Sequence, residues 1–329
     1  MPTLRDVNIL RRRGLIPAVR YFDAASLARD DEAWAAWAGR ALLAIGAGHL
    51  LAGIVFFFAY NWADMPAFAK FGVLEAGIVI AFVGGWLAGI DRPAGQVLLI
   101  GASVLVGALL AVVGQVYHTD ADAYSLFAAW IFLILPWTLA SRSAAHWAVW
   151  LVVAYFAARL YGEQALVADG RITSTALDVG LGVLAAIALL LREAAVATGL
   201  TWLAAAWTRI ALVIAALTLL FIPAVSYVLD WRGEELAPAA FLLALAMGAV
   251  VYRRWLPDFA AGAALVGFAA LFGIAGGYRA IEEIIGFDWD DEPRILASLG
   301  LLILWSVATM GLAAKLLQAL HRRMEPQPS

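Results

Sequence analysis

Long apolar runs separated by short polar connections fill the sequence from residue 41 onward. Such runs indicate membrane-spanning helices, because about 20 apolar residues cross the hydrocarbon core of a bilayer and an open segment can satisfy its backbone there only as a helix. We expect about ten of them, over residues 41–60, 71–90, 96–116, 123–140, 145–160, 176–191, 209–229, 238–252, 259–278 and 293–317. The pattern predicts an all-α integral membrane protein.

The remaining segments are short. Residues 1–40 are the only soluble-looking part, and they are expected to form an amphipathic helical hairpin at the membrane surface, on the cytoplasmic side. The rest of the chain is expected to divide into four parts: a first half with five helices (41–160), an extracytoplasmic link (161–175), a second half with five helices (176–318) and a cytoplasmic tail (319–329). Residues 194–207 are apolar, but roughly 14 residues are too few for a normal span, so they are left out of the count.

Composition supports this class of protein. The chain is 64% apolar and 14% charged, with a mean hydropathy of +0.87, whereas soluble domains are about half apolar and a quarter charged. It has no cysteine, which excludes disulfides, thiolate metal sites, iron–sulfur clusters and cysteine nucleophiles. The Arg-rich start has no apolar core of signal-peptide length directly behind it, so no cleaved signal peptide is expected.

The basic residues predict the orientation. With ten spans and a cytoplasmic N-terminus, most of the 22 Lys and Arg residues lie on the inner side, as the positive-inside rule requires. The exceptions are Lys70, Arg159, Arg171, Arg232, Arg279 and Arg294. Both termini are therefore expected to be cytoplasmic.

The densest polar cluster lies between the helices expected at 96–116 and 123–140. In the predicted orientation it faces outward, as does the link between the first two helices. Glu75 lies about 6–8 Å below the same surface, because it is four or five residues into its helix at 1.5 Å per residue. We hypothesise a polar pocket that opens outward, with these candidate ligand-binding or proton-coupling residues: Asn61, Asp64, Lys70, Glu75, Gln115, His118, Asp120 and Asp122.

Glu75 is the sharpest candidate. A carboxylate inside a span costs several kcal/mol unless it is paired or protonated, and such residues are functional by default. A structural ion pair or hydrogen bond, with Lys70, Gln115 or His118 as partner, would satisfy the same requirement without any function.

The histidines and acids near the membrane also have two interpretations. His49 lies near mid-membrane, where it would suit a proton relay or a haem ligand, but His146 lies near the inner end of its helix and supplies no second mid-membrane ligand. We favour a hydrogen-bonded core histidine and expect no cofactor. His118, Asp120 and Asp122 carry suitable groups for a divalent cation, but helix capping by Thr119 or Asp120 and the helix dipole explain them more simply, so no metal is expected.

Several of these residues carry a family resemblance. Together, residues 52–62, Ala69-Lys70-Phe71 with Glu75, residues 113–122, residues 126–130 and Leu135-Pro136-Trp137 resemble the bacterial membrane family known as domain of unknown function 2157. The resemblance covers about residues 1–160. It implies a multi-pass protein of the bacterial inner membrane, and it implies no particular activity or site.

Three classes of function remain. The chain has no Walker loop, Gly-x-Ser-x-Gly, His-Glu-x-x-His or dinucleotide fingerprint, so those enzyme classes lack support, and its spread-out basic residues do not suggest nucleic-acid binding. A transporter or a protein that binds a small solute or lipid is favoured, because of the intramembrane carboxylate. The alternatives are a membrane enzyme or assembly factor acting on a lipid-linked envelope substrate, and a scaffold subunit. Membrane lipids are the expected partners, and nothing indicates a particular protein partner.

Overall fold

The structure is a computed structural model that describes residues 64–118, 122–230, 234–287 and 291–324, together with scattered positions among the first 63 residues. The regular structure in these ranges is entirely helical. The elements are α4 (Ala67–Ala88), α5 (Pro93–Tyr117), α6 (Ala123–Ser141), α7 (Ala144–Tyr161), η2 (Gly162–Val167), α8 (Ser174–Ala197), η3 (Thr201–Leu203), α9 (Ala206–Asp230), α10 (Leu236–Val250), η4 (Val251–Trp255), α11 (Phe259–Ile284) and α12 (Glu292–Met324).

Within the described ranges, nine helical stretches are long and apolar enough to cross a membrane. They correspond in order to the second to tenth helices expected from the sequence, which confirms the all-α membrane class. The helix expected at 41–60 and the hairpin expected within residues 1–40 fall largely outside the described residues. The orientation of the termini and the division into two halves stay predictions.

The ambiguous segment 194–207 does not form a separate helix that could span a membrane. Helix α8 continues to Ala197, a turn with Gly199 at φ +100° follows, and the short 3-10 helix η3 leads into α9 at Ala206. The segment is therefore a corner between two spans, and leaving it out of the count was correct. The C-terminal end of α8 was predicted at residue 191, six residues before its observed end at Ala197.

Two spans end in wider helical turns. Helix α7 continues into the π-helix η2, so part of the link expected at 161–175 is helical, and α10 continues into the π-helix η4. In η4 the N–H of Leu256 donates to the carbonyl of Val251 at 2.9 Å, five residues back. Such π-turns are uncommon and frequently occur at functional sites.

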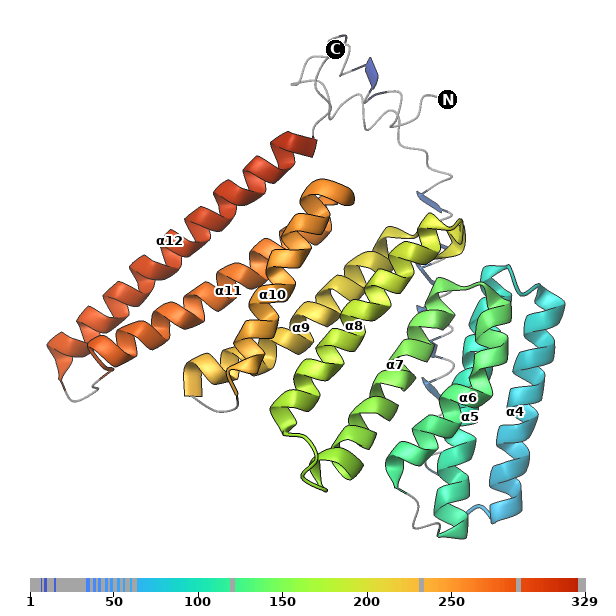
Figure 1. Ribbon diagram of the computed structural model, residues 1–329. Helices are drawn as coiled ribbons and strands as arrows, with labels where there is room; N and C mark the ends of the chain where they lie inside the picture. The colour runs from blue at the N-terminus through green and yellow to red at the C-terminus, as the bar shows by residue number, and fades with distance from the viewer. Residues whose placement is uncertain are drawn as a thin grey trace. The chain divides into compact units, whose positions relative to one another are not determined.

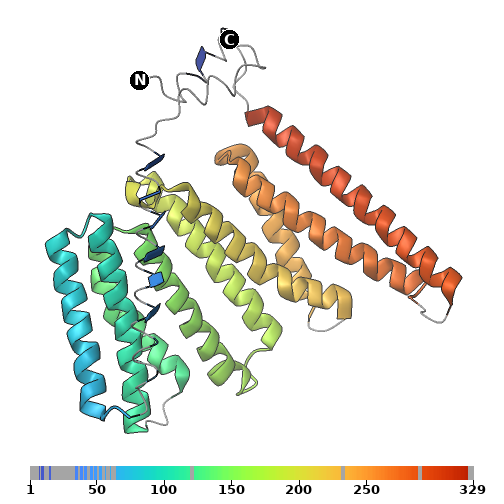
Figure 2. The same ribbon diagram turned by 180° about the vertical axis from the view of Figure 1, so that it is seen from behind.

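Two groups of helices pack through different kinds of core. Helices α5, α6 and α7 lie side by side, whereas α9 contacts α8, α10 and α11, and α12 packs along α11 (Figures 1 and 2). The core around α9 is apolar. It includes Leu217 and Leu220 of α9, Phe241 of α10 and Leu265 of α11, all buried.

Glycines allow close packing at a few points. A Cβ on Gly107 of α5 would collide with the indole of Trp130 on α6, and one on Gly277 of α11 would collide with Trp305 on α12. Gly277 belongs to one of the two Gly-x-x-x-Gly pairs in the sequence. In the other pair, Gly85 lies against α5, but Gly89 has φ +94° and follows the end of α4.

Candidate functional site

Helices α5, α6 and α7 enclose polar side chains in an otherwise apolar layer. Ser103 of α5, Thr138 and Ser141 of α6, and His146 of α7 are all 0% exposed. We call Ser103, Trp130, Trp137 and His146 the serine–histidine cluster, because their side chains or backbone are joined by hydrogen bonds across all three helices. A buried polar group must be hydrogen-bonded or it destabilises the fold, so the geometry of this cluster matters.

Ser103 is the centre of the cluster. Its hydroxyl donates to the carbonyl of Leu99 at 3.1 Å and accepts the indole N–H of Trp137 at 2.8 Å. The indole N–H of Trp130 donates to the backbone carbonyl of Ser103 at 2.7 Å. Both indoles of α6 are thus turned toward α5, and the absent side chain of Gly107 leaves room for Trp130.

His146 completes the cluster from α7. Its Nε2 lies 2.7 Å from the Ser103 hydroxyl oxygen. The serine proton is directed to Leu99, so the consistent assignment makes Nε2–H the donor and leaves Nδ1 as an acceptor. Nδ1 is buried and has no hydrogen-bond partner among the residues that the structure describes. It is therefore the atom of the cluster that can accept a further hydrogen bond.

The corner before α7 explains why His146 points into the layer. Arg142 ends α6 in the left-handed conformation, with φ +46°. Ser143 then caps α7, since its hydroxyl accepts the backbone N–H of His146 at 3.4 Å and donates to Gln96 of α5 at 3.1 Å. The cap holds the first turn of α7 against α5, and His146 lies in that turn.

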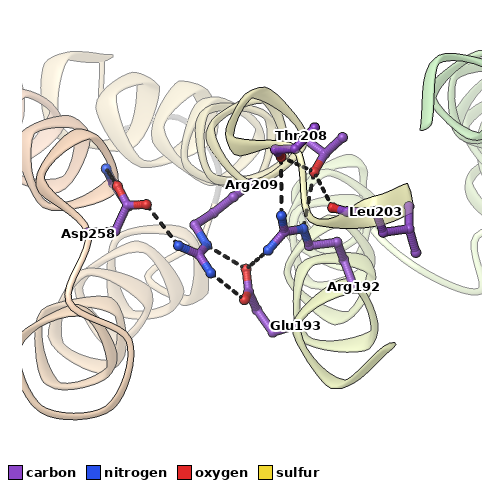
Figure 3. Close-up of polar contacts among 8 residues, drawn as sticks. Arg192, Glu193, Leu203, Thr208, Arg209 and Asp258 are labelled. Atoms are coloured by element: carbon purple, nitrogen blue, oxygen red, sulfur yellow. Dashed lines mark hydrogen bonds and ion pairs between the residues drawn. The ribbon is translucent and has the colours of Figure 1, made fainter. Parts of the chain in front are cut away.

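A second polar group, the charged network, joins the ends of three other helices (Figure 3). Arg209 of α9 pairs with both carboxylate oxygens of Glu193 on α8, each at 2.8 Å. Its remaining nitrogen pairs with Asp258 at 2.8 Å, at the N-cap of α11. This forked geometry suits guanidinium groups.

Arg192 extends the charged network on the α8 side. It pairs with Glu193 at 2.7 Å and donates to Thr208 at 3.1 Å and to the carbonyl of Ala205 at 3.2 Å. The side chains are 5% to 20% exposed. Two cations and two carboxylates balance one another, so the network is electrically neutral. Each charge has a partner, which is why these side chains can be buried.

Asp258 lies just before the first residue of α11, outside the membrane-spanning segment, and the pKa of its carboxyl group is below its ordinary value. Burial acts to raise the pKa of this carboxyl group, but hydrogen bonds from the backbone N–H of Ala261 and from Arg209 outweigh that effect. The carboxylate therefore stays charged at neutral pH and serves as both helix cap and ion-pair partner.

The candidates predicted from the sequence lie at exposed or half-buried positions, or outside the described residues. Asn61 and Asp120 are outside, and Lys70 is half-buried in the first turn of α4. The exposed ones are Asp64, Glu75, Gln115, His118 and Asp122. His49 is also exposed, and its Nδ1 lies 2.9 Å from the carbonyl of Ile45, so its hydrogen bond is within its own turn.

The structure brings some of these residues to one end of adjacent helices. The rings of Phe71 and Tyr117 stack at 6.1 Å, which places the start of α4 beside the end of α5. Glu75 lies four residues after Phe71, and Gln115 lies two residues before Tyr117. The described hydrogen bonds of His118 are local, since its Nδ1 lies 3.3 Å from the carbonyl of Val116. The shared pocket stays a prediction.

Asp122 occupies the N-cap position of α6, but its side chain makes no capping hydrogen bond. Its carbonyl accepts from the backbone N–H and the hydroxyl of Ser125, at 2.9 and 2.7 Å. Both residues predicted to cap this helix, Thr119 and Asp120, lie outside the described residues. In the described part of the chain, no group of three His, Asp or Glu side chains could hold a metal ion.

Sequence reasoning missed both polar groups that the structure assembles. Ser103 is one small polar residue in a long apolar run, and its contact with His146 spans 43 positions in the chain. Arg192 and Arg209 were interpreted only as markers of the inner surface. The adjacent pair Arg192-Glu193 at the end of an apolar run was the available signal, because charges there need partners.

Comparison with known proteins supports the family resemblance. Residues 9–147 match the family described as predicted membrane protein (DUF2157). The match includes α4, α5, α6 and the first turn of α7, and thus every member of the serine–histidine cluster, whereas the charged network lies beyond it. No curated protein and no solved structure matches the chain.

Proposed function

We propose that this membrane protein is a transporter that binds a small polar solute within the α5–α7 layer, and that it resides in the bacterial inner membrane. The observation that carries the proposal is the buried Nδ1 of His146, which has no hydrogen-bond partner in the described part of the chain and lies in a helix long enough to cross a membrane. Polar groups inside spans are expensive and mark solute or proton pathways. Transporters bind their substrates near the bilayer midplane, and Ser103 lies near the middle of the 25-residue helix α5.

Each residue of the cluster has a role in this proposal. His146 accepts a hydrogen bond from a hydroxyl or amine of the solute through Nδ1, and Ser103 orients the imidazole through Nε2. Trp130 and Trp137, anchored by their hydrogen bonds to Ser103, supply flat apolar walls, as in many small-molecule sites. No ionic partner is required, which favours a neutral or zwitterionic solute.

The predicted outer residues are the entrance in this proposal. Gln115, His118 and Asp122 lie at helix ends, and Glu75 lies eight residues after the first residue of α4. Gln115 is about 18 Å along α5 from Ser103 at 1.5 Å per residue. Polar groups thus occur at two levels of the same helix layer. A solute that enters at the outer level would reach the serine–histidine cluster deeper in the membrane.

A density map of the full-length protein in lipid nanodiscs tests the proposal. We expect non-protein density within hydrogen-bonding distance of Nδ1 of His146, in a cavity that reaches the outer level. If a group from residues 1–63 pairs with Nδ1 and the cluster is close-packed, the proposal is wrong and the scaffold interpretation is favoured.

A solute panel tests it in solution. The melting temperature of the purified protein is measured with neutral sugars, polyols and amino acids at millimolar concentration. A ligand should raise the melting temperature of the wild type and should not raise that of His146→Leu. The control variant is His321→Gln, which changes a histidine at the far end of α12.

A further inference from the structure

The wide turn η4 at the end of α10 carries two consecutive arginines beside an open cavity. The cavity has a volume of about 320 Å³ and is lined by Ala249, Val250, Arg253 and Arg254. Consecutive side chains diverge less in a π-turn than in an α-helix, so both arginines can line one cavity. The cavity combines an apolar wall with two guanidinium groups.

The charge of these arginines is not compensated within the described part of the chain. Both are exposed, and neither forms an ion pair there. The acids on the neighbouring helix ends, Glu193 and Asp258, are already bound by Arg192 and Arg209 in the charged network. The cavity therefore presents about two positive charges to its surroundings.

The backbone of η4 is held in place by the contacts of its neighbours, so Arg253 and Arg254 project from a fixed backbone. Tyr252, between Val251 and Arg253, is only 5% exposed and belongs to the apolar core around α9. Asp258 follows four residues after Arg254 and ties the start of α11 to Arg209. Binding an anion at η4 therefore requires no ordering of the backbone.

The apolar surface next to the cavity identifies the kind of anion. Leu243, Met247 and Val250 lie at positions i, i+4 and i+7 of α10, and they are 60%, 55% and 45% exposed. These spacings place the three side chains on one helix face. Trp255 is 71% exposed at the end of η4, where tryptophan marks the membrane–water interface. A dissolved phosphate would contact only the arginines, whereas a phospholipid would also cover this stripe with an acyl chain.

We propose that Arg253 and Arg254 bind the phosphodiester headgroup of an anionic phospholipid, with its acyl chain along the apolar stripe of α10. Guanidinium groups bind phosphate oxygens through paired hydrogen bonds. The site is separate from the serine–histidine cluster and does not depend on the proposed transport function.

Native mass spectrometry of the full-length protein tests the site. The protein is equilibrated with equal amounts of phosphatidylglycerol and phosphatidylcholine, and retained lipids are counted. The test variant is Arg253→Gln/Arg254→Gln. The matched control, Lys315→Gln/Arg322→Gln, removes two exposed charges near the end of α12. We expect the affinity of the test variant for phosphatidylglycerol to fall about 10- to 30-fold, since each basic residue near a membrane contributes about one factor of five, and the control to keep it.

Two outcomes would overturn the proposal. One is equal retention of phosphatidylglycerol by the wild type and the test variant, or an equal loss in the control. The other concerns the source of the phosphate group. If 10 mM inorganic phosphate, an amount on the order of a weak site's dissociation constant, displaces the lipid completely, the site recognises a free anion. Retention of the lipid in that buffer supports the acyl-chain contact.

Discussion

The serine–histidine cluster and the charged network solve the same problem with different chemistry. The cluster uses only uncharged groups, and Ser103 and His146 are 0% exposed. The network uses four charges, and its members keep up to 20% of their side-chain surface exposed. Removing an ion from water costs several kcal/mol even after relaxation, whereas a neutral group needs only a hydrogen-bond partner. Burial thus accompanies the chemistry, because the fully buried cluster is uncharged and the charged network keeps part of its surface exposed.

The two regions also differ in how many residues share the hydrogen bonds and ion pairs that hold the helices together. The charged network joins three helices through the guanidinium group of Arg209, so a single change removes the cation that Glu193 and Asp258 share and leaves only the Arg192–Glu193 pair. The serine–histidine cluster distributes its hydrogen bonds over a hydroxyl, an imidazole and two indoles. We therefore expect the network to be more sensitive to a single substitution, although it is the more exposed of the two.

The largest effect is expected for Arg209→Met. It leaves Glu193 and Asp258 mostly buried without their shared cation, which should lower the free energy of unfolding by about 3–5 kcal/mol. Reversible unfolding in a mixed detergent measures it. The double variant Arg209→Met/Asp258→Asn should recover part of the loss, because it removes the unpaired charge of Asp258 and keeps the Arg192–Glu193 pair. A loss below about 1 kcal/mol would mean that the network behaves like a surface ion pair.

Ser103→Ala should have the next largest effect. It removes the partner of both His146 Nε2 and Trp137 Nε1, at about 1–3 kcal/mol for each buried group left unpaired. Thr138→Val is the matched control, because the equally buried Thr138 hydroxyl bonds only to the carbonyl of Ile134 in its own helix. Equal unfolding free energies for the two variants would contradict the central role of Ser103.

Gly107→Ala should destabilise the α5–α6 contact by about 1–3 kcal/mol, the usual cost of overpacking. The new methyl group would collide with the Trp130 indole and weaken its bond to Ser103. Gly101→Ala on the same helix is the control, because a Cβ there meets nothing within 4 Å. Thermal unfolding followed by tryptophan fluorescence compares them, and a stable Gly107→Ala variant with unchanged fluorescence would argue against this packing.

The smallest effect is expected for Asp258→Asn, at about 1–2 kcal/mol near neutral pH. Asparagine still caps α11, so only the charged bond to Arg209 is lost. Because the pKa of Asp258 is lowered in the folded protein, its contribution is present above the unfolded value of about 3.9 and is lost as pH falls through the lower folded pKa. Urea unfolding of both proteins between pH 3 and 7 should show the difference shrinking only in the acid range. A difference independent of pH would contradict the assignment.

Much of the fold could be predicted because a bilayer allows few alternatives. The run at 123–140 became α6, with only Ser141 added, since an apolar segment in lipid must satisfy its backbone within itself. Helix ends were harder. Residues after Leu191 and Tyr278 look polar enough to leave the membrane, yet α8 and α11 continue past them, because Arg192 and Arg279 pair with Glu193 and Glu282.

The polar site was less predictable than the helices. Hydropathy shows that Ser103 and His146 lie in apolar runs, but it does not show which face of α5 meets α7. The cap at Ser143 and the space above Gly107 decide that, and both are tertiary features. The outer candidates were chosen only for their polar side chains and their expected depth in the membrane. These criteria place Glu75 and Gln115 in the same part of the layer, but they do not show that the two side chains are in contact.

The short corner between α6 and α7 has a consequence for biosynthesis. Only Arg142 and Ser143 separate the two helices, so neither helix can settle across a bilayer while the other remains outside. The pair must enter as one hairpin. Within that hairpin, Trp150 already donates to the carbonyl of Ile131 at 3.1 Å, and Ser141 donates to Thr138 at 2.9 Å. Insertion as a unit therefore hides these groups before lipid surrounds them, whereas Trp130, Trp137 and His146 find their partner only on α5.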